Sequence, residues 1–356
     1  MKKKVPHADI LILERGMFPN GASMRNAGFA CFGSVSELLD DLNQRSEDEV
    51  FTLVEKRWTG LQLLREIAGE MELDYEELGG YEVFSENDKE SFDKCIGKLS
   101  FLNKQLKAIT GKAKVFEISD HRISEFGLSN IHHMIRNSCE GQLNPGKMIA
   151  RLIQLASGLG IRMANGASVL SIEDHIDGAS VAIQNPAQLK DSEDHIRIQT
   201  RKLLICTNGY ARQFLPDIDL RPARAQVLLT SPIPNLKIRG SFHYDKGYYY
   251  FRNIDGRVLF GGGRNLDPQG ETTYAMGLTP LIQNKLEELL STIILPQTPY
   301  EIELRWSGIM GLGNSKSPII QQTGRNVFCA VRLGGMGIAI GSLAGKEAAE
   351  LITQAL

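Results

Sequence analysis

Two neighbouring features near the amino terminus have the residue types to take part in ligand binding. An apolar run at 10–13 ends in the acid Glu14, and a glycine-rich polar loop, GASMRNAGFACFG, follows at 21–33. An acid at the end of a buried strand accepts hydrogen bonds from ribose hydroxyls in dinucleotide-binding folds. The two features together predict a dinucleotide site. Taken alone, Glu14 is also consistent with a solvated acid that opens a loop.

The loop at 21–33 could line both a phosphate and a flat ring. Small residues let backbone N–H groups approach a phosphate closely. The residues that offer a hydroxyl group, side-chain donors or free space are Ser23, Arg25, Asn26, Gly28, Ala30 and Gly33. The alternative is a polar loop that caps a helix, because Ser34 and Ser36 stand directly before an apolar, helix-like segment.

A third feature lies near the carboxyl end, in RLGGMGIAIGSLAGKEAAE at 332–350. Here an apolar strand ends in tandem glycines, and a helix begins within a few residues. Helix N-termini carry free N–H groups and a partial positive charge. They suit an anionic group or the electron-rich edge of a reduced ring. Tight packing of a terminal helix is the alternative.

Helix-like and alternating patterns place these features on a mixed α/β chain. Apolar residues recur at three- and four-residue spacing in 34–71, which predicts two amphipathic helices. Three short alternating runs between 169 and 200 predict antiparallel strands. The remaining helices are expected at 88–109, at 275–291, in the first part of 144–163 and after 337, and the remaining strands at 8–13, 79–85, 202–210, 301–311 and across the β-rich region 223–264.

Bulk composition narrows the class of protein. The chain has 356 residues, of which 42% are hydrophobic and 23% charged, as is usual for a globular domain or pair of domains. A net charge of -2 gives no basic footprint, so no nucleic-acid partner is expected. No apolar stretch approaches the ~18 residues of a membrane span. Five cysteines without CxxC spacing indicate a reducing, cytoplasmic location.

No metal site is predicted from residue spacing. Histidines, cysteines and acids do not recur at the short separations typical of metal ligands. His132 and His133 are adjacent, so on a helix or a strand they cannot both face one site.

Several short motifs, in this order along nearly the whole chain, resemble the D-amino-acid oxidase-like superfamily of flavin oxidoreductases, of the glycine and sarcosine oxidase type. Each motif alone is unspecific, and their order carries the resemblance. They are LERG at 13–16, GASMRNAG at 21–28, EGQLNPGKM at 140–148, ICTNGYA at 205–211, RVLFGGGR at 257–264, RWSGIMG at 305–311 and the ending at 332–345.

The resemblance implies an α/β fold of two interleaved domains. One is a glutathione-reductase-type, Rossmann-like domain that binds FAD, and the other is an α+β substrate domain built on an antiparallel sheet. The implied boundaries are 1–40, 139–215 and 325–356 for the FAD-binding domain, and 41–138 and 216–324 for the substrate domain. The implied partner is a small-molecule amine or amino acid.

The resemblance also implies roles for individual residues. Glu14 would bind the adenosine ribose and Arg15 would lie on the adenine side, where Val169 would contact adenine through its backbone. The residues implied to line the pyrophosphate and the flavin are Ser23, Arg25, Asn26 and Ala27. Those implied to turn the chain close to the cofactor, or to lie beside the flavin pyrimidine ring, are Thr207, Asn208, Gly209, Gly335, Met336 and Gly337.

One part of a dinucleotide fold has no counterpart in the sequence. The GxGxxG loop lies about 20 residues before the ribose-binding acid, and only thirteen residues precede Glu14. The run at 10–13 is therefore expected to be the second strand of the fold. Two explanations remain: a shortened flavoenzyme, which the flavin-side motifs favour, or a fold that has lost FAD and serves as a binding protein. Either predicts weak FAD binding.

On the substrate side, hydride transfer to flavin needs an oriented amine or amino acid. A carboxylate is held best by a bidentate arginine, and Arg252 and Arg332 are favoured over Arg264 and Arg305, with Tyr249 as a helper. Where glycine oxidase has its carboxylate-binding arginine in the closing motif, this chain has Gly335. A different amine therefore remains open, as does oxidation in tRNA wobble-uridine modification, which the net charge disfavours.

Overall fold

An eight-stranded sheet is the largest element of the structure, a computed structural model that describes residues 1–185 and 195–356. The strand order is β16-β12-β15-β14-β13-β3-β5-β4, and every pairing is antiparallel except that of β13 with β3. The strands are β3 (Gly80–Phe84), β4 (Phe116–Ile118), β5 (His133–Asn137), β12 (Arg221–Thr230), β13 (Ser241–Tyr244), β14 (Tyr249–Ile254), β15 (Arg257–Gly262) and β16 (Ile302–Leu312).

The two faces of this sheet differ in character because successive side chains of a strand point to opposite sides. One face is apolar and packs against α7 (Pro280–Leu289) and the π-helical turn Leu290–Ile294. Its core includes Phe242, Phe251 and Leu286, all of which are buried. The opposite face carries the side chains between these residues, several of them polar.

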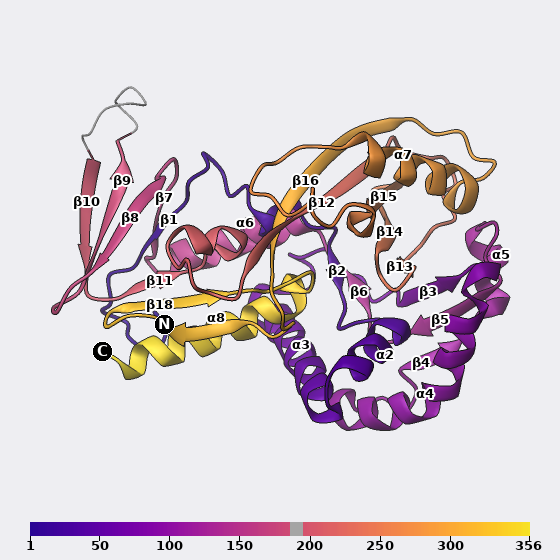
Figure 1. Cartoon of the computed structure of the whole chain (residues 1–356), viewed down its shortest axis with the longest axis horizontal. Helices are drawn as coiled ribbons and strands as arrows, with labels where there is room; N and C mark the ends of the chain where they lie inside the picture. Colours follow the sequence, from indigo (N-terminus) through magenta and orange to yellow (C-terminus); the bar gives the residue numbers. More distant parts are fainter. Residues whose placement is uncertain (186–194) are drawn as a thin grey trace.

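Helices cover the other end of the sheet, around β3, β4 and β5 (Figure 1). They are α2 (Val35–Gln44), α3 (Glu47–Ala68), α4 (Lys89–Thr110) and the short α5 (Ile123–Phe126). Capping boxes at Ser34 and Ser46 begin α2 and α3, since each serine accepts from a glutamate N–H three residues on and that glutamate binds back. Both helices lie within 34–71, as the sequence predicts.

Two further parallel strand pairs lie in separate small sheets at the opposite end of the molecule (Figure 1). β1 (Leu11–Leu13) pairs in parallel with β7 (Arg162–Ala164), and β11 (Leu203–Ile205) pairs in parallel with β18 (Val327–Val331). Within the described residues, β1 and β18 share no hydrogen bonds. The other elements of this half are β17 (Ile319–Gln322), β8 (Val169–Asp174), β9 (Ala179–Gln184), β10 (His195–Thr200), α6 (Pro145–Gly158) and α8 (Gly337–Gln354).

Most expected elements are present, and the differences have physical causes. The helix expected at 275–291 begins only at Pro280, because proline is favoured at the first helical position and 275–279 run as a loop. The strand expected at 202–210 covers only Leu203–Ile205 before a 3-10 helix, η3 (Asn208–Gln213), begins. The turn at Asp255 and Gly256 has positive φ at both residues, as a tight hairpin requires.

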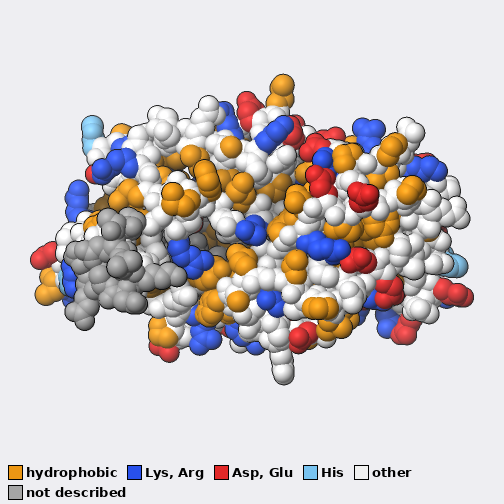
Figure 2. All heavy atoms as spheres, turned by 90° about the horizontal axis from the view of Figure 1, so that it is seen from above, with side chains coloured by type: hydrophobic (Ala, Val, Ile, Leu, Met, Phe, Trp, Pro, Cys, Tyr) orange, Lys and Arg blue, Asp and Glu red, His pale blue; other side chains and the backbone are white. Residues whose placement is uncertain are grey.

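The face of the molecule seen from above carries both hydrophobic and charged side chains (Figure 2). Figure 2 shows hydrophobic side chains across much of the face seen from above, with Lys and Arg among them and more Asp and Glu towards one end. In the chain outside 186–194, no helix combines the length and the apolar character that crossing a membrane requires.

Helices α3 and α8 pack closely, and α8 thereby joins the small parallel sheets to the helical layer (Figure 1). Gly60 of α3 makes the approach possible, because a Cβ atom there would lie 2.3 Å from the Ala339 carbonyl oxygen of α8. Gly97, on the exposed side of α4, has open space where its Cβ atom would lie.

We expect Gly60→Ala to lower the free energy of unfolding by about 1–3 kcal/mol, because overpacking forces the two helices apart. Gly97→Ala is the matched control. Alanine is a better helix former than glycine, so this change should raise stability by up to about 1 kcal/mol. Urea unfolding followed by circular dichroism measures both. Equal effects of the two changes would show that α3 and α8 do not depend on this contact.

Candidate functional site

The loop at 21–28 is shaped by the side chain of Asn26. Its amide donates to the Ala22 and Ser23 carbonyl oxygens (3.1 and 2.8 Å), and its Oδ1 atom accepts from the Gly28 N–H (2.9 Å). These bonds close the short helix α1 (Ala22–Arg25) and turn the chain into β2 (Phe29–Ala30). Ala27 is buried where the loop meets the sheet.

The same loop is attached to β16 of the large sheet. Arg25 donates from Nη1 to the Ser307 carbonyl oxygen (3.0 Å), and Trp306 donates from Nε1 to the Arg25 carbonyl oxygen (2.9 Å). The loop that sequence motifs predict as a cofactor wall therefore lies against the polar face of the sheet.

Asn208 joins the middle and the end of the chain. Its backbone has a φ of 44°, and its Oδ1 atom accepts from the N–H groups of Arg332 (2.9 Å) and Leu333 (3.2 Å). Thr207 precedes η3, and Gly209 lies so near β16 that a Cβ atom would be 2.6 Å from the Met310 carbonyl oxygen. The two segments predicted to approach the cofactor are thus in direct contact.

The turn before α8 is open. Added Cβ atoms at Gly334 and Gly335 would meet no heavy atom within 4 Å, and the same is true at Gly21. Gly337 begins α8, whose first N–H groups have no partners within the helix. Met336 faces back to the first loop, because its Sδ atom lies 3.5 Å from Cys31 Sγ.

The residues predicted for the adenosine side occupy a separate region. Glu14 follows β1, and its Oε1 atom accepts from the Gly16 N–H (2.7 Å). The Arg15 guanidinium lies 4.5 Å from the Tyr210 ring centroid, in a cation–π arrangement. Val169 is the first residue of β8 and pairs with Ile183.

Arg252 is buried on the polar face of the sheet. It is 2% exposed, donates from Nη2 to the Leu143 carbonyl oxygen (3.0 Å), and has no hydrogen-bond partner at Nε. Burial lowers the pKa of Arg252 to about 10, against the opposing effects of Glu76 and Asp255. Its Nη2 atom also lies beside Gly28, where a Cβ atom would be 2.2 Å from the Leu143 carbonyl oxygen.

Tyr249 does not share a face with Arg252. It lies in the apolar core under α7, whereas Tyr250 shares the face of Arg252 and packs edge-on against Phe29, with ring centroids 5.5 Å apart. Tyr249 is therefore not placed to assist Arg252, contrary to the expectation from the sequence. Tyr250 is the tyrosine on the same face as Arg252. Burial raises the pKa of both phenols to about 12, so both are protonated near neutral pH.

Arg332 has different partners from Arg252. Its Nη1 atom forms an ion pair with Asp219 (2.6 Å), and its Nε atom donates to the Ser317 carbonyl oxygen (2.8 Å). The structure thus does not bring the two predicted arginines together on one ligand. Arg305 is also engaged, with Gln283 and Glu287 of α7.

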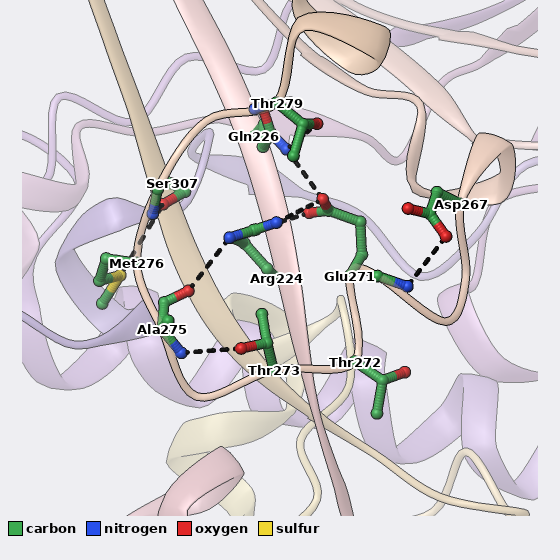
Figure 3. Close-up of polar contacts among 12 residues, drawn as sticks. Arg224, Gln226, Asp267, Glu271, Thr272, Thr273, Ala275, Met276, Thr279 and Ser307 are labelled. Carbon is green, nitrogen blue, oxygen red and sulfur yellow. Dashed lines mark hydrogen bonds and ion pairs between the residues drawn. The ribbon is translucent and has the colours of Figure 1, made fainter.

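A loop at 263–279 lies over β12 and β16, and no regular pattern in the sequence indicates it (Figure 3). Glu271 is fully buried and receives Arg224 through two hydrogen bonds (2.9 and 2.7 Å). Gln226 donates to the same carboxylate (3.0 Å), and the Gly277 N–H donates to Ser307 Oγ (2.9 Å).

Three further residues meet although 31, 140 and 243 are far apart in sequence. His243 Nε2 lies 2.6 Å from Glu140 Oε1, and Cys31 Sγ completes a group whose ligand-type atoms lie within 4.8 Å of one another. Burial alone would lower the pKa of His243, but Glu140 raises it to about 9. Burial raises the pKa of the Cys31 thiol. Residue spacing along the chain predicts no metal site, and it cannot reveal a group that three separate elements bring together.

A Rossmann-like half joined to a large sheet with a polar, partly buried face defines a two-part oxidoreductase fold. The chain belongs to the FAD dependent oxidoreductase (DAO) family, whose sequence profile matches residues 2–351. It is an enzyme of the amino-acid-oxidase-like class, as the sequence motifs predict. It is 23% identical to the Probable oxidoreductase OrdL of Rhizobium meliloti, over 96% of this chain and 77% of that protein.

Solved structures share the fold. Glycine oxidase from Bacillus cereus superposes with a TM-score of 0.72 at 18% identity, over 99% of this chain and 92% of that one. Iminodiacetate oxidase from a Chelativorans species gives a TM-score of 0.73 at 17% identity, over 97% of this chain and 95% of that one. The α/β fold with a second, sheet-based part is thereby confirmed.

FAD is the cofactor of this family, and the residues of the chain fit its flavin end. The turn at 334–335 and Gly21 face open space, which backbone could share with a flat ring. The N-terminus of α8 supplies free N–H groups beside it. Met24 in the loop at 21–28 is 44% exposed and offers apolar surface.

We expect Asn26→Ala to lower the free energy of unfolding by about 1–3 kcal/mol, because it removes the bonds that close the loop at 21–28 and each is worth about 0.5–1.5 kcal/mol. FAD should also bind more weakly. Asn26→Asp keeps the acceptor for the Gly28 N–H and should lose less. Urea unfolding and flavin-fluorescence titration measure the two effects. Unchanged FAD affinity in Asn26→Ala would separate this loop from the cofactor.

Proposed function

We propose that this enzyme oxidises the carbon–nitrogen bond of an amino acid, or of another small amine with an anionic group. FAD, when bound, supplies the acceptor for a hydride from the carbon next to nitrogen. In this proposal the loop at 21–28, the turn at 207–209 and the turn at 335–337 hold the cofactor. The divisions 1–40, 139–215 and 325–356 against 41–138 and 216–324 separate cofactor binding from substrate binding.

Arg252 carries the proposal. A guanidinium that is 2% exposed, with one carbonyl partner and an unpartnered Nε, is costly to bury. A carboxylate would supply the missing partner through a charge-assisted hydrogen bond. Arg252 faces the same side of the sheet as Tyr250, which lies against the segment that follows the cofactor loop.

Tyr250 has the properties of a hydrogen-bond donor in this proposal. With a pKa of about 12 its phenol keeps its proton near neutral pH, so it can orient a substrate but cannot serve as a base. The buried sheet face around it excludes water from the substrate. The relatives support the reaction class, since their names include glycine, iminodiacetate and L-amino-acid substrates.

The substrate is tested with matched pairs of compounds that differ only by a carboxylate. The full-length chain is loaded with FAD, made anaerobic and mixed with L-proline against pyrrolidine, or glycine against methylamine. Bleaching of the flavin absorption by the acids, and slower bleaching by the matched amines, is the expected result. Bleaching by the amines alone would refute the role of a substrate carboxylate, and no bleaching by any amine would refute amine oxidation.

We expect Tyr250→Phe to lower kcat/KM about 10-fold, the value of one hydrogen bond of about 1.4 kcal/mol. Tyr249→Phe is the matched control, because this side chain lies on the other face, in the core under α7. It should leave kcat/KM unchanged. Steady-state rates with the best substrate measure the difference. Equal losses in the two variants would remove Tyr250 from the site.

A further inference from the structure

Three side chains with metal-binding atoms converge beneath the cofactor loop. Cys31 follows β2, Glu140 precedes β6 (Gly141–Gln142), and His243 lies on β13. One atom of each, a thiol sulfur, a carboxylate oxygen and an imidazole nitrogen, lies within 4.8 Å of the other two. Their exposed fractions are 3%, 0% and 5%, so the cluster is closed to bulk solvent.

The polar groups of the cluster are incompletely satisfied. Glu140 binds His243 through Oε1, but its Oε2 atom is buried without a hydrogen-bond partner. The side-chain nitrogen of Asn137, close to it, is also unpartnered. Buried carboxylate oxygens are nearly always paired in folded proteins, by hydrogen bonds or by a cation. The Glu140 Oε2 atom is therefore available to a hydrogen-bond donor or a cation.

A small cavity lies beside two of the three residues. It measures about 10 Å³ and is lined by Glu140, His243, Glu82 and Asn137 but not by Cys31, and this is about the volume needed for a single water-sized occupant. Glu82 does not require the occupant, because Ser34 and Ser36 already bind its carboxylate. Of the two carboxylates, Glu140 is the one with an oxygen that has no hydrogen-bond partner.

We propose that Cys31, Glu140 and His243 bind a Zn²⁺ ion. Thiolate, imidazole and carboxylate are the three ligand types that Zn²⁺ takes from proteins, and three protein ligands leave one position open. Ca²⁺ and Mg²⁺ are bound through oxygen alone, so this donor set excludes them. Binding would replace the contact between Glu140 and His243 with two bonds to the metal and release the protons of the thiol and the imidazole.

The proposed metal site lies beside Tyr250, because His243 and Tyr250 are paired residues on β13 and β14. Met336 Sδ lies 3.5 Å from Cys31 Sγ, so the metal would sit next to the turn at 335–337. Phe29 packs edge-on against both rings, with centroid distances of 5.4 Å to His243 and 5.5 Å to Tyr250. Metal content and spectra test the site directly, because neither measurement depends on enzymatic activity.

The test uses the full-length chain, without a histidine tag, produced in zinc-supplemented medium and desalted over a chelating resin. We expect about one zinc per chain by elemental mass spectrometry. Replacement of zinc by Co²⁺ should give a thiolate-to-cobalt charge-transfer band. Cys31→Ser should abolish the band, and His243→Gln and Glu140→Gln should lose the zinc. Cys206→Ser, a thiol outside the cluster, should keep both.

Thermal unfolding keeps the proposal testable even if a variant fails to fold. Zinc should raise the Tm of the wild-type chain and of Cys206→Ser, since a ligand that binds only the native state stabilises it. It should leave the Tm of a folded Cys31→Ser chain unchanged. The wild-type result decides the proposal even if the variants misfold. A folded wild-type chain without zinc and without a cobalt band, or zinc retained in Cys31→Ser and His243→Gln, overturns it.

Discussion

The two-residue repeat of the β-strands is the constraint on which the rest of the structure depends. On β14 it places Phe251 against α7 and Arg252 on the opposite side, and on β13 it does the same for Phe242 and His243. Because the strands are held in register by their neighbours, one apolar face fixes the direction of every side chain on the other. The packing of the core under α7 therefore also determines where the side chains of the polar face lie.

Segments distant in sequence meet this polar face through backbone contacts. Asn208 binds the backbone of Arg332 and Leu333, and Trp306 binds the carbonyl of Arg25. Contacts of this kind constrain the position of the main chain and leave the side chains facing the open turn free. The glycines at the end of β18 then keep that space clear. The proposed cofactor region is thus built mainly by backbone geometry, with few side chains of special chemistry.

Local signals explain which elements could be predicted. The capping serines at 34 and 46, the proline and asparagine that begin α6, and the Asp255–Gly256 turn act over a few residues and read directly from the sequence. The short strands β4, β13 and β17 could not be predicted in this way, because only pairing with their neighbours in the sheet defines them. Motif order identified the family, since that order reflects the path of the chain through the fold.

Side-chain partners could not be predicted in the same way. Alternation along 248–250 shows that neighbouring tyrosines point apart, but only the packing of α7 decides that Tyr249 is the one in the core. Cys31, Glu140 and His243 come together through β2, the turn before β6 and β13, and no spacing rule covers such separations. Arg332 looks available in sequence, yet Asp219 neutralises it across a loop contact.

The loop at 263–279 is attached to the face of the sheet that carries α7, because Gln226 of β12 binds both Glu271 of the loop and Gln283 of α7. Two charge-assisted bonds from Arg224 to Glu271, each worth about 1.5–3 kcal/mol, hold it with further bonds to Gln226 and Ser307 (Figure 3). Breaking the first two alone would limit the lifted form to roughly one molecule in a hundred to one in ten thousand. The loop and this edge of the sheet therefore behave as one rigid unit.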